Sequence, residues 1–320
     1  MSRIHEALRK AAQERATNPA TDLTVPLQDT LVRATPAREV RMPDVGVPTE
    51  EFATEAPALP DLVRQGSDLQ FDHIVKQCAH PKWHPDPNVN VFSNAEPGAR
   101  GAEQFRTLRS RLYQLRNSQP LRTLLVTSAL PGEGKTFVSN NLAQGIVRQS
   151  DRRALLIDAD LRRPRLHASL GAPAAPGLAD YLRGTADEMS IMQHGQEGNL
   201  CFIAGGSQVT NPSELLSSGR FKALIERVAP VFDWIILDSP PCVPVADANI
   251  LADLCDGVLL VVRAGATRSE VAHRACQELQ AKNVVGVVLN AVDEPHLHGS
   301  YYYYQGSDYE YSSSGAQAKG

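Results

Sequence analysis

A glycine-rich segment near the middle of the chain has the residues needed to hold phosphate groups. Residues 129–136 read Ala-Leu-Pro-Gly-Glu-Gly-Lys-Thr, which departs from the pattern GxxxxGK[ST] at Ala129 but matches it at Gly134, Lys135 and Thr136. Glycines let successive backbone N–H groups turn towards phosphate oxygens, the lysine neutralises their charge, and the hydroxyl binds Mg²⁺. The predicted nucleotide-binding residues here are Pro131, Gly132, Glu133, Gly134, Lys135, Thr136 and Phe137.

Three aspartates follow two other apolar runs of the sequence. Asp158 and Asp160 come after one run, and Asp238 comes after the next such run that ends in an acidic residue. Because ligands of open α/β sheets bind at the carboxyl ends of the strands, we expect the three carboxylates near the phosphate-binding segment. Asp160 and Asp238 are predicted to hold Mg²⁺ together with Thr136. One of Asp158 and Asp160 also serves as general base for an incoming hydroxyl, and the sequence leaves open which.

The elements that must position these groups form a regular pattern from about residue 96. Short apolar runs rich in β-branched residues alternate with helix-length stretches, which is typical of buried parallel strands covered by helices. The runs predicted as strands are 123–128, 154–157, 200–203, 234–237, 257–262 and 284–289, and a helix is predicted over 103–116. We therefore predict an α/β fold of the P-loop type over residues 96–297, with a mainly parallel sheet and helices on both faces.

The segments on either side of residues 96–297 differ from this pattern in composition. Residues 1–15 place several apolar side chains on one face and are predicted to form a short helix, either frayed or ordered by a partner. Residues 16–95 are rich in proline without a sustained apolar period, so we predict a largely disordered linker with a short docking element at 68–80. Residues 298–320, here called the tail, are rich in Tyr, Ser and Gly and are predicted to be flexible.

Composition and net charge limit the compartments in which the chain is expected and the partners that it is expected to bind. The formal net charge is −4, which gives no general attraction to nucleic acid, so no nucleic-acid partner is expected. The sequence has no apolar run long enough to span a bilayer and no secretory signal over residues 1–15. The five scattered cysteines lack CxxC pairing and are typical of reduced thiols, so we expect a cytoplasmic protein.

Three motifs together resemble the bacterial tyrosine kinases of polysaccharide export systems. They are PGEGKT, LLIDADLRRP after the second predicted strand, and IILDSPP. The element Asp158-x-Asp160-x-Arg162 separates this family from generic P-loop ATPases, and the family is related to the septum-positioning and plasmid-partition ATPases. Those relatives usually carry an extra lysine early in the P-loop, where this chain has Ala129-Leu-Pro. The resemblance covers roughly residues 96–311.

The resemblance implies that ATP and Mg²⁺ are the cofactors and that the γ-phosphate moves to tyrosine hydroxyls. The predicted acceptors are Tyr301, Tyr302, Tyr303, Tyr304, Tyr309 and Tyr311. The alternative for this tail is a sticky segment that binds partners through aromatic contacts. Arg162 is expected either to stabilise phosphate charge or to pair with a carboxylate. Asn290 is implied to contact the adenine, with an ordinary turn asparagine as the equal alternative.

Further implications of the resemblance concern assembly and control. Glu103, Arg106 and Arg109 match the ExxRxxR helix that packs subunits of this family into a ring, although an exposed salt-bridged helix face would give the same spacing. Similarity to the stand-alone members implies a separate membrane-spanning chain-length regulator that activates the chain and recruits it to the inner face of the membrane. A tyrosine phosphatase and a role in exopolysaccharide synthesis or export are also implied. The rival hypotheses are a partition or positioning ATPase without kinase activity and a nucleotide-binding regulator without catalysis.

Overall fold

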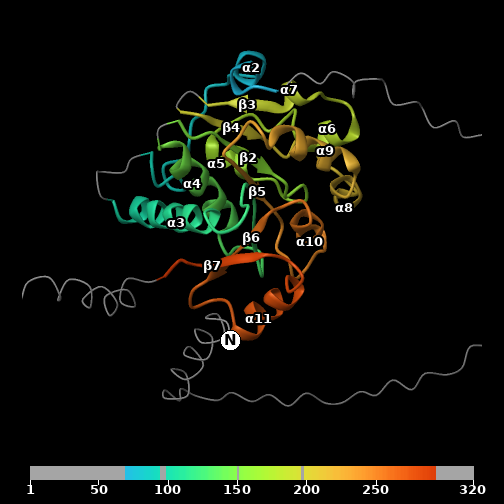
Figure 1. Ribbon diagram of the computed structural model, residues 1–320. Helices are drawn as coiled ribbons and strands as arrows, with labels where there is room; N and C mark the ends of the chain where they lie inside the picture. The colour runs from blue at the N-terminus through green and yellow to red at the C-terminus, as the bar shows by residue number, and fades with distance from the viewer. Residues whose placement is uncertain (1–68, 94–98, 150, 196–197, 293–320) are drawn as a thin grey trace, which may run out of the picture. The chain divides into compact units, whose positions relative to one another are not determined.

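The chain folds around a seven-stranded sheet with the strand order β3-β4-β2-β5-β1-β6-β7 (Figure 1). This computed structural model describes residues 69–93, 99–149, 151–195 and 198–292. The strands are β1 (Thr123–Ser128), β2 (Ala154–Asp158), β3 (Met192–His194), β4 (Leu200–Ile203), β5 (Trp234–Asp238), β6 (Gly257–Arg263) and β7 (Val284–Asn290). Neighbouring strands are parallel except for β3, which is antiparallel to β4. The predicted fold class is confirmed, and all six predicted strands are present; β3 was not predicted.

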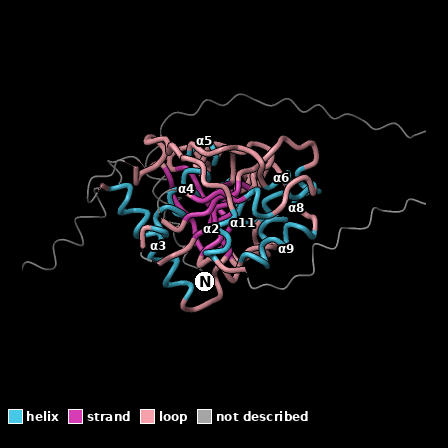
Figure 2. Tube along the Cα trace, turned by 90° about the horizontal axis from the view of Figure 1, so that it is seen from above, coloured by secondary structure: helices cyan, strands magenta, loops and turns pink. Residues whose placement is uncertain are grey.

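Helices cover both faces of the sheet, as predicted (Figure 2). One face carries α3 (Arg100–Arg116), α4 (Lys135–Val147) and α5 (Leu166–Leu170). The other carries α2 (Phe71–Gln77), α6 (Leu178–Arg183), α7 (Glu188–Ile191), α8 (Pro212–Leu216), α9 (Gly219–Val228), α10 (Asp247–Ala252) and α11 (Ser269–Glu278). Because side chains of a strand alternate between faces, Leu124 and Val126 join the apolar cluster under α4, whereas Leu125 joins the opposite cluster.

Residues 69–93, here called the strap, are ordered and wrap the β3 edge of the sheet. The helix α2 within it buries Phe71 and Ile74, which confirms the docking element predicted at 68–80. Beyond α2, the backbone N–H of Ala79 donates to Met192 (3.1 Å), and the N–H of His194 donates to Ala79 (2.9 Å). The predicted disordered linker is therefore wrong over this stretch, because an edge strand offers unpaired backbone groups that an irregular segment can use.

The second half of the strap is fixed to α4 by buried side-chain amides. Asn90 donates from Nδ2 to the carbonyl of Ser169 and accepts from Nδ2 of Asn140, both within 2.7 Å. Asn141 accepts the backbone N–H of Val91 through Oδ1 (2.9 Å). Buried polar groups need such partners to offset their lost hydration. The strap thus contacts the helix that begins at the phosphate-binding lysine.

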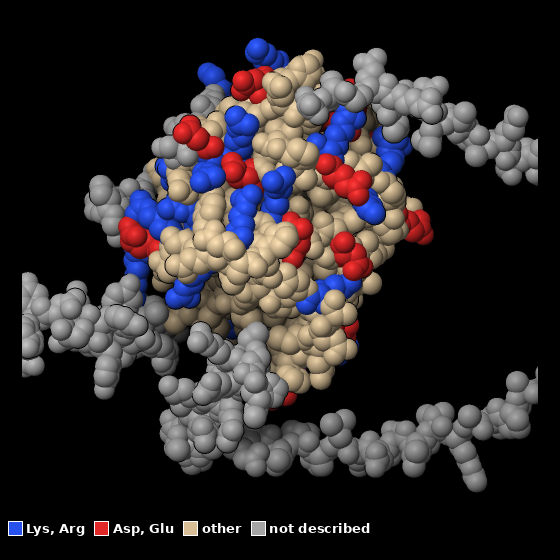
Figure 3. Space-filling model, in the orientation of Figure 1, with Lys and Arg blue, Asp and Glu red and all other residues tan. Residues whose placement is uncertain are grey.

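Figure 3 shows basic and acidic side chains interspersed over the face seen there, so neither sign of charge forms a continuous field on it. None of the helices in the described ranges is long and apolar enough to cross a bilayer. The predicted helix at 1–15, the linker up to residue 68 and the tail tyrosines lie outside the described residues.

Candidate active site

The phosphate-binding segment forms a tight loop between β1 and α4. Gly132 and Gly134 have φ angles of +84° and +95°, a left-handed conformation that favours glycine. A side chain at position 134 would also collide with Nδ2 of Asn290, which donates to the carbonyl of Glu133 (2.8 Å). The helix α4 begins directly after this loop and has no side-chain cap, so its first backbone N–H groups, which lack intrahelical partners, can bind phosphate. Asn290, predicted at the adenine, supports the loop backbone in this structure.

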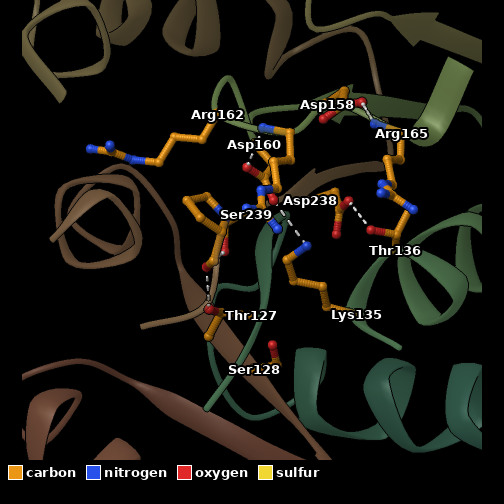
Figure 4. A network of polar contacts seen from close by, with 12 residues as sticks. Thr127, Ser128, Lys135, Thr136, Asp158, Asp160, Arg162, Arg165, Asp238 and Ser239 are labelled. Carbon is orange, nitrogen blue, oxygen red and sulfur yellow. Dashed lines mark hydrogen bonds and ion pairs between the residues drawn. The ribbon is translucent and has the colours of Figure 1, made fainter. Parts of the chain in front are cut away.

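The ends of β1, β5 and β2 bring the reactive side chains together (Figure 4). Nζ of Lys135 lies 3.0 Å from Oδ2 of Asp160. Oγ1 of Thr136 donates to Oδ2 of Asp238 at 2.7 Å. Asp158 is the direct neighbour of Asp238 across the β2–β5 pair. The three aspartates that the sequence placed at strand ends thus lie around the first residues of α4.

The electrostatics of this cluster are dominated by the burial of its carboxylates, which the positive charge of Lys135 offsets only in part. Burial raises the pKa of Asp238 to about 6, against the attraction of Lys135 and the hydrogen bonds from Thr136 and Ser139. Burial would lower the pKa of Lys135, but attraction by Asp238 and Asp160 outweighs it and raises that pKa. The site therefore has an excess of negative charge that a cation would neutralise.

Asp158 is the most deeply buried of the three carboxylates. Its Oδ2 atom accepts the backbone N–H groups of Arg165 and Leu166, each at 3.0 Å. Its Oδ1 atom is buried and has no hydrogen-bond partner among the described residues. Burial and repulsion by Asp238 hold the pKa of Asp158 well above its usual range, despite the two N–H donors. A buried oxygen without a partner, on a carboxylate with a raised pKa, makes Asp158 a candidate reactive group.

The residues present fit Mg²⁺ bound beside phosphates better than a metal bound by protein alone. No group of three His, Cys, Asp or Glu side chains within the described ranges is arranged to hold an ion. Magnesium usually takes one or two carboxylates and completes its shell with phosphate and water oxygens. Thr136, Asp160 and Asp238 supply a hydroxyl and two carboxylates here, and the raised pKa of Asp238 indicates that a cation would be favoured.

Other predicted site residues take different positions. Arg162 pairs with Asp247, from Nε to Oδ2 at 2.6 Å, which is the pairing with a carboxylate that was one of its two predicted roles; the role at a phosphate stays a prediction. The side chain of Glu133 is buried and accepts the N–H of Leu130 (2.8 Å), which leaves only its backbone for phosphate. The ring of Phe137 packs edge-on against Phe105 in the core.

Three residues near the site were missed. Ser139 donates from Oγ to Oδ1 of Asp238 (3.0 Å), and its place one helical turn after Lys135 was a signal that could have found it. Ser213 and Asp247 hold Arg162, with Ser213 accepting from the guanidinium at 2.9 Å. Asp247 lies 85 residues from Arg162 in the chain, so no local pattern points to the pair.

The predicted subunit-contact motif lies on α3. Arg106 forms an ion pair with Glu103 on an exposed face. Arg109 instead turns inward, and its guanidinium donates to the carbonyl of Gly145 (2.6 Å). This geometry is the one expected of an exposed, salt-bridged helix face. It also leaves the side chains of Glu103 and Arg106 accessible, so the subunit contact stays a prediction.

Comparison with known proteins identifies the family. No protein-family model matches the chain. The chain is 34% identical over 221 residues to tyrosine-protein kinase YwqD of Bacillus subtilis, covering 68% of this chain and 92% of that protein. It is 34% identical to tyrosine-protein kinase etk of Escherichia coli K12 over 211 residues, which are 65% of this chain and only 29% of that protein.

Solved structures agree with the sequence relatives. The kinase domain of Escherichia coli tyrosine kinase ETK superposes with a TM-score of 0.60 at 32% identity, covering 72% of this chain and 83% of that one. The BceF tyrosine kinase domain gives a TM-score of 0.56 at 29% identity, covering 64% of this chain and 83% of that one. These likenesses confirm the predicted resemblance and favour it over a partition or positioning ATPase. The chain belongs to the bacterial tyrosine-protein kinase family.

Proposed function

We propose that the chain transfers the γ-phosphate of ATP to tyrosines of its own tail. The observation that carries this proposal is the gathering of Lys135, Thr136 and three aspartates at one edge of the sheet. Phosphoryl transfer needs positioning and charge neutralisation more than covalent chemistry, and this edge supplies a backbone loop, a lysine and acidic metal ligands. Membership in a tyrosine kinase family supports tyrosine as the acceptor.

Each group has a distinct task in this reaction. The N–H groups of residues 132–136 and the Lys135 ammonium bind the β- and γ-phosphates. Thr136, Asp160 and Asp238 hold Mg²⁺, which neutralises the phosphate oxygens when it is bound. Because Asp160 pairs with Lys135 in this structure, bound phosphates would compete with that carboxylate for the lysine.

Asp158 is the better candidate for the general base. Asp160 pairs with Lys135 in this structure and is the carboxylate that we assign to Mg²⁺, whereas Oδ1 of Asp158 has no partner among the described residues. The two backbone donors on Oδ2 hold the carboxylate in one orientation. A tyrosine hydroxyl has a reference pKa of about 10, and a carboxylate whose own pKa is raised accepts its proton more readily.

The acceptors and the control of the reaction follow from the family resemblance. The proposed acceptors are Tyr301, Tyr302, Tyr303, Tyr304, Tyr309 and Tyr311, presented by a neighbouring copy in a ring that forms through α3. Each phosphate adds about −1.5 to −2 charge, so a modified tail would be repelled from the acidic site and alter assembly. We further propose a cytoplasmic protein, recruited to the inner membrane face by a chain-length regulator and reset by a tyrosine phosphatase, that controls exopolysaccharide synthesis or export.

One experiment tests the proposal on the full chain. The purified protein is incubated with Mg·ATP, and phosphate is mapped by mass spectrometry in the wild type, in Lys135→Met and in a variant with all six tail tyrosines changed to Phe. Lys76→Met is the matched control, because Lys76 is an exposed lysine on α2. We expect tail phosphotyrosine in the wild type and the control only. ATP hydrolysis without any phosphotyrosine would instead support the ATPase alternative.

For the base, Asp158→Asn is compared with Asp160→Asn in single-turnover reactions. The proposal expects Asp158→Asn to slow transfer by about 100-fold while nucleotide affinity stays the same. A larger loss of nucleotide affinity in Asp158→Asn than in Asp160→Asn would reverse the two roles.

A further inference from the structure

Three arginines follow the reactive aspartates on one turn. The backbone N–H of Arg163 donates to Oδ1 of Asp160 (3.1 Å), and the N–H of Arg165 donates to Oδ2 of Asp158 (3.0 Å). The third, Arg162, lies between Asp160 and Arg163 in the sequence. Because the backbone of this turn is bonded to the carboxylates, the arginine side chains start from fixed points at the rim of the site.

Only one of the three arginines is used within the described part of the chain. Arg162 is bonded to both oxygens of the buried Asp247 and extends away from Lys135 (Figure 4). The side chains of Arg163 and Arg165 are exposed and form no hydrogen bond or ion pair with any described residue. Two positive charges at the rim are thus available to a ligand.

The charges around these arginines favour an anionic ligand at the rim but not inside the site. Asp158, Asp160 and Asp238 would repel an acidic peptide that approaches Lys135, and phosphates of a bound nucleotide would add to this repulsion. Arginines at the rim offset the repulsion for negative side chains that stay outside, next to an uncharged tyrosine that enters. The rim therefore suits a tyrosine with acidic neighbours.

The tail contains such tyrosines beside others that lack acidic neighbours. Tyr309 lies between Asp308 and Glu310, and Tyr311 follows Glu310. The run Tyr301–Tyr304 is flanked by Ser300 and Gln305, which carry no charge. In an extended peptide neighbouring side chains point to opposite sides, so a tyrosine that enters the site leaves both of its neighbours directed outward.

We propose that Arg163 and Arg165 select acceptor tyrosines with acidic neighbours, so that Tyr309 and Tyr311 are phosphorylated in preference to Tyr301–Tyr304. This inference rests on the proposed kinase function and specifies its acceptors. Two solvent-exposed charge pairs, as at Tyr309, are worth about a five-fold preference together, and the single pair at Tyr311 is worth about two-fold. The preference decreases at high salt because exposed charges are screened.

The test uses full chains in both roles. The acceptor is the Lys135→Met chain, and the donors are the wild type and the double variant Arg163→Glu/Arg165→Glu. Mass spectrometry gives the ratio of phosphate on Tyr309 and Tyr311 to phosphate on Tyr301–Tyr304. We expect the ratio to fall about five-fold or more with the reversed donor. An acceptor that also carries Asp308→Lys and Glu310→Lys should restore the ratio with that donor and lower it with the wild type.

Controls separate this inference from the function on which it rests. Lys222→Glu, at an exposed lysine on α9, reverses a charge elsewhere and should leave the ratio unchanged. Absence of phosphotyrosine with the wild-type donor overturns the kinase proposal itself. Phosphotyrosine with the same ratio for both donors overturns the selection alone. An equal loss on all tyrosines with a raised KM for ATP would mean that the arginines hold nucleotide phosphates, which also overturns it.

Discussion

Nζ of Lys135 lies 3.0 Å from Oδ2 of Asp160, with 15% of the lysine side chain and 6% of the aspartate side chain exposed. The two residues come from different elements, the start of α4 and the turn after β2. The ion pair thus ties the phosphate-binding loop to the turn that carries the other reactive groups. It also holds the ammonium at the strand ends, so part of the site is preorganised.

Replacing Lys135 should affect both activity and stability. Lys135→Met removes the cation and leaves Asp160 buried without its partner, so we expect kinase activity to fall at least 100-fold. The free energy of unfolding should fall by about 2 kcal/mol, because an uncompensated buried charge is costly. Urea unfolding and phosphotyrosine formation measure the two effects. A variant that loses activity without any loss of stability would argue that the ion pair contributes nothing to the fold.

Replacing Asp238 should abolish activity but raise stability, whereas replacing Lys135 should lower both. Burial raises the pKa of Asp238 to about 6 in the folded chain, whereas an unfolded aspartate has a pKa of about 3.9. Between these values the folded state binds the proton that the unfolded state has lost, so stability decreases as pH rises through this window. Asp238→Asn should remove that decrease and make the nucleotide-free protein about 1–3 kcal/mol more stable than the wild type at neutral pH.

Measuring the stability of Asp238→Asn and of the wild type at a second, acidic pH tests whether the charge of Asp238 causes the difference. Urea unfolding at about pH 4 should show little difference between Asp238→Asn and the wild type, because the wild-type carboxyl is then protonated in the folded state. Kinase activity of the variant should be lost at every pH. Equal stabilisation at both pH values would show that something other than the charge of Asp238 is responsible.

Local patterns explain why much of the site was predictable. The strands of the sheet centre are buried on both faces and are therefore continuous apolar runs, and their ends identify Asp158 and Asp238. The P-loop is contiguous in sequence, so its glycines and Lys135 could be placed before the structure was known. By contrast, β3 has three residues at the edge of the sheet, too few for a periodic pattern.

Contacts between distant segments explain what was not predictable. The strap has little apolar period because polar amides fix it, as in the bond from Asn140 to Asn90 across 50 positions. The sequence predicts either a phosphate or a carboxylate as the partner of Arg162, and the carboxylate that it contacts, Asp247, is 85 residues away. Specific polar pairing at such separations depends on the fold, so the composition of either segment does not reveal it.

The pair Arg162–Asp247 should respond unequally to loss of either member. The Asp247 side chain is fully buried, whereas 39% of the Arg162 side chain is exposed. Asp247→Ala lets the arginine turn to water, and we expect a loss of about 1 kcal/mol. Arg162→Ala leaves a buried carboxylate with Ser213 as its remaining side-chain donor, and we expect a loss of about 2–3 kcal/mol.

The same pair predicts a pH dependence. Burial would raise the pKa of Asp247, but the hydrogen bonds from Arg162 and Ser213 outweigh it and lower that pKa below its usual value. Stability from the pair is therefore present above the unfolded pKa of about 3.9 and is lost as pH falls through the folded pKa. The cost of Arg162→Ala should accordingly shrink in acid, as urea unfolding at several pH values would measure. Arg163→Ala is the control, and a constant cost of Arg162→Ala at all pH values would exclude the charge-based explanation.

The three residues of the α3 motif should separate assembly from folding. The side chains of Glu103 and Arg106 are 52% and 42% exposed, so Glu103→Ala and Arg106→Ala should change the unfolding free energy by less than about 0.5 kcal/mol. Arg109 donates to the carbonyl of Gly145, so Arg109→Ala should cost about 1 kcal/mol. If α3 packs subunits, the first two variants should give smaller particles in light scattering and slower phosphorylation between chains at unchanged stability. Gln114→Ala, at an exposed position of the same helix, is the control; unchanged particle size in Glu103→Ala and Arg106→Ala would assign these residues to an ordinary solvated face.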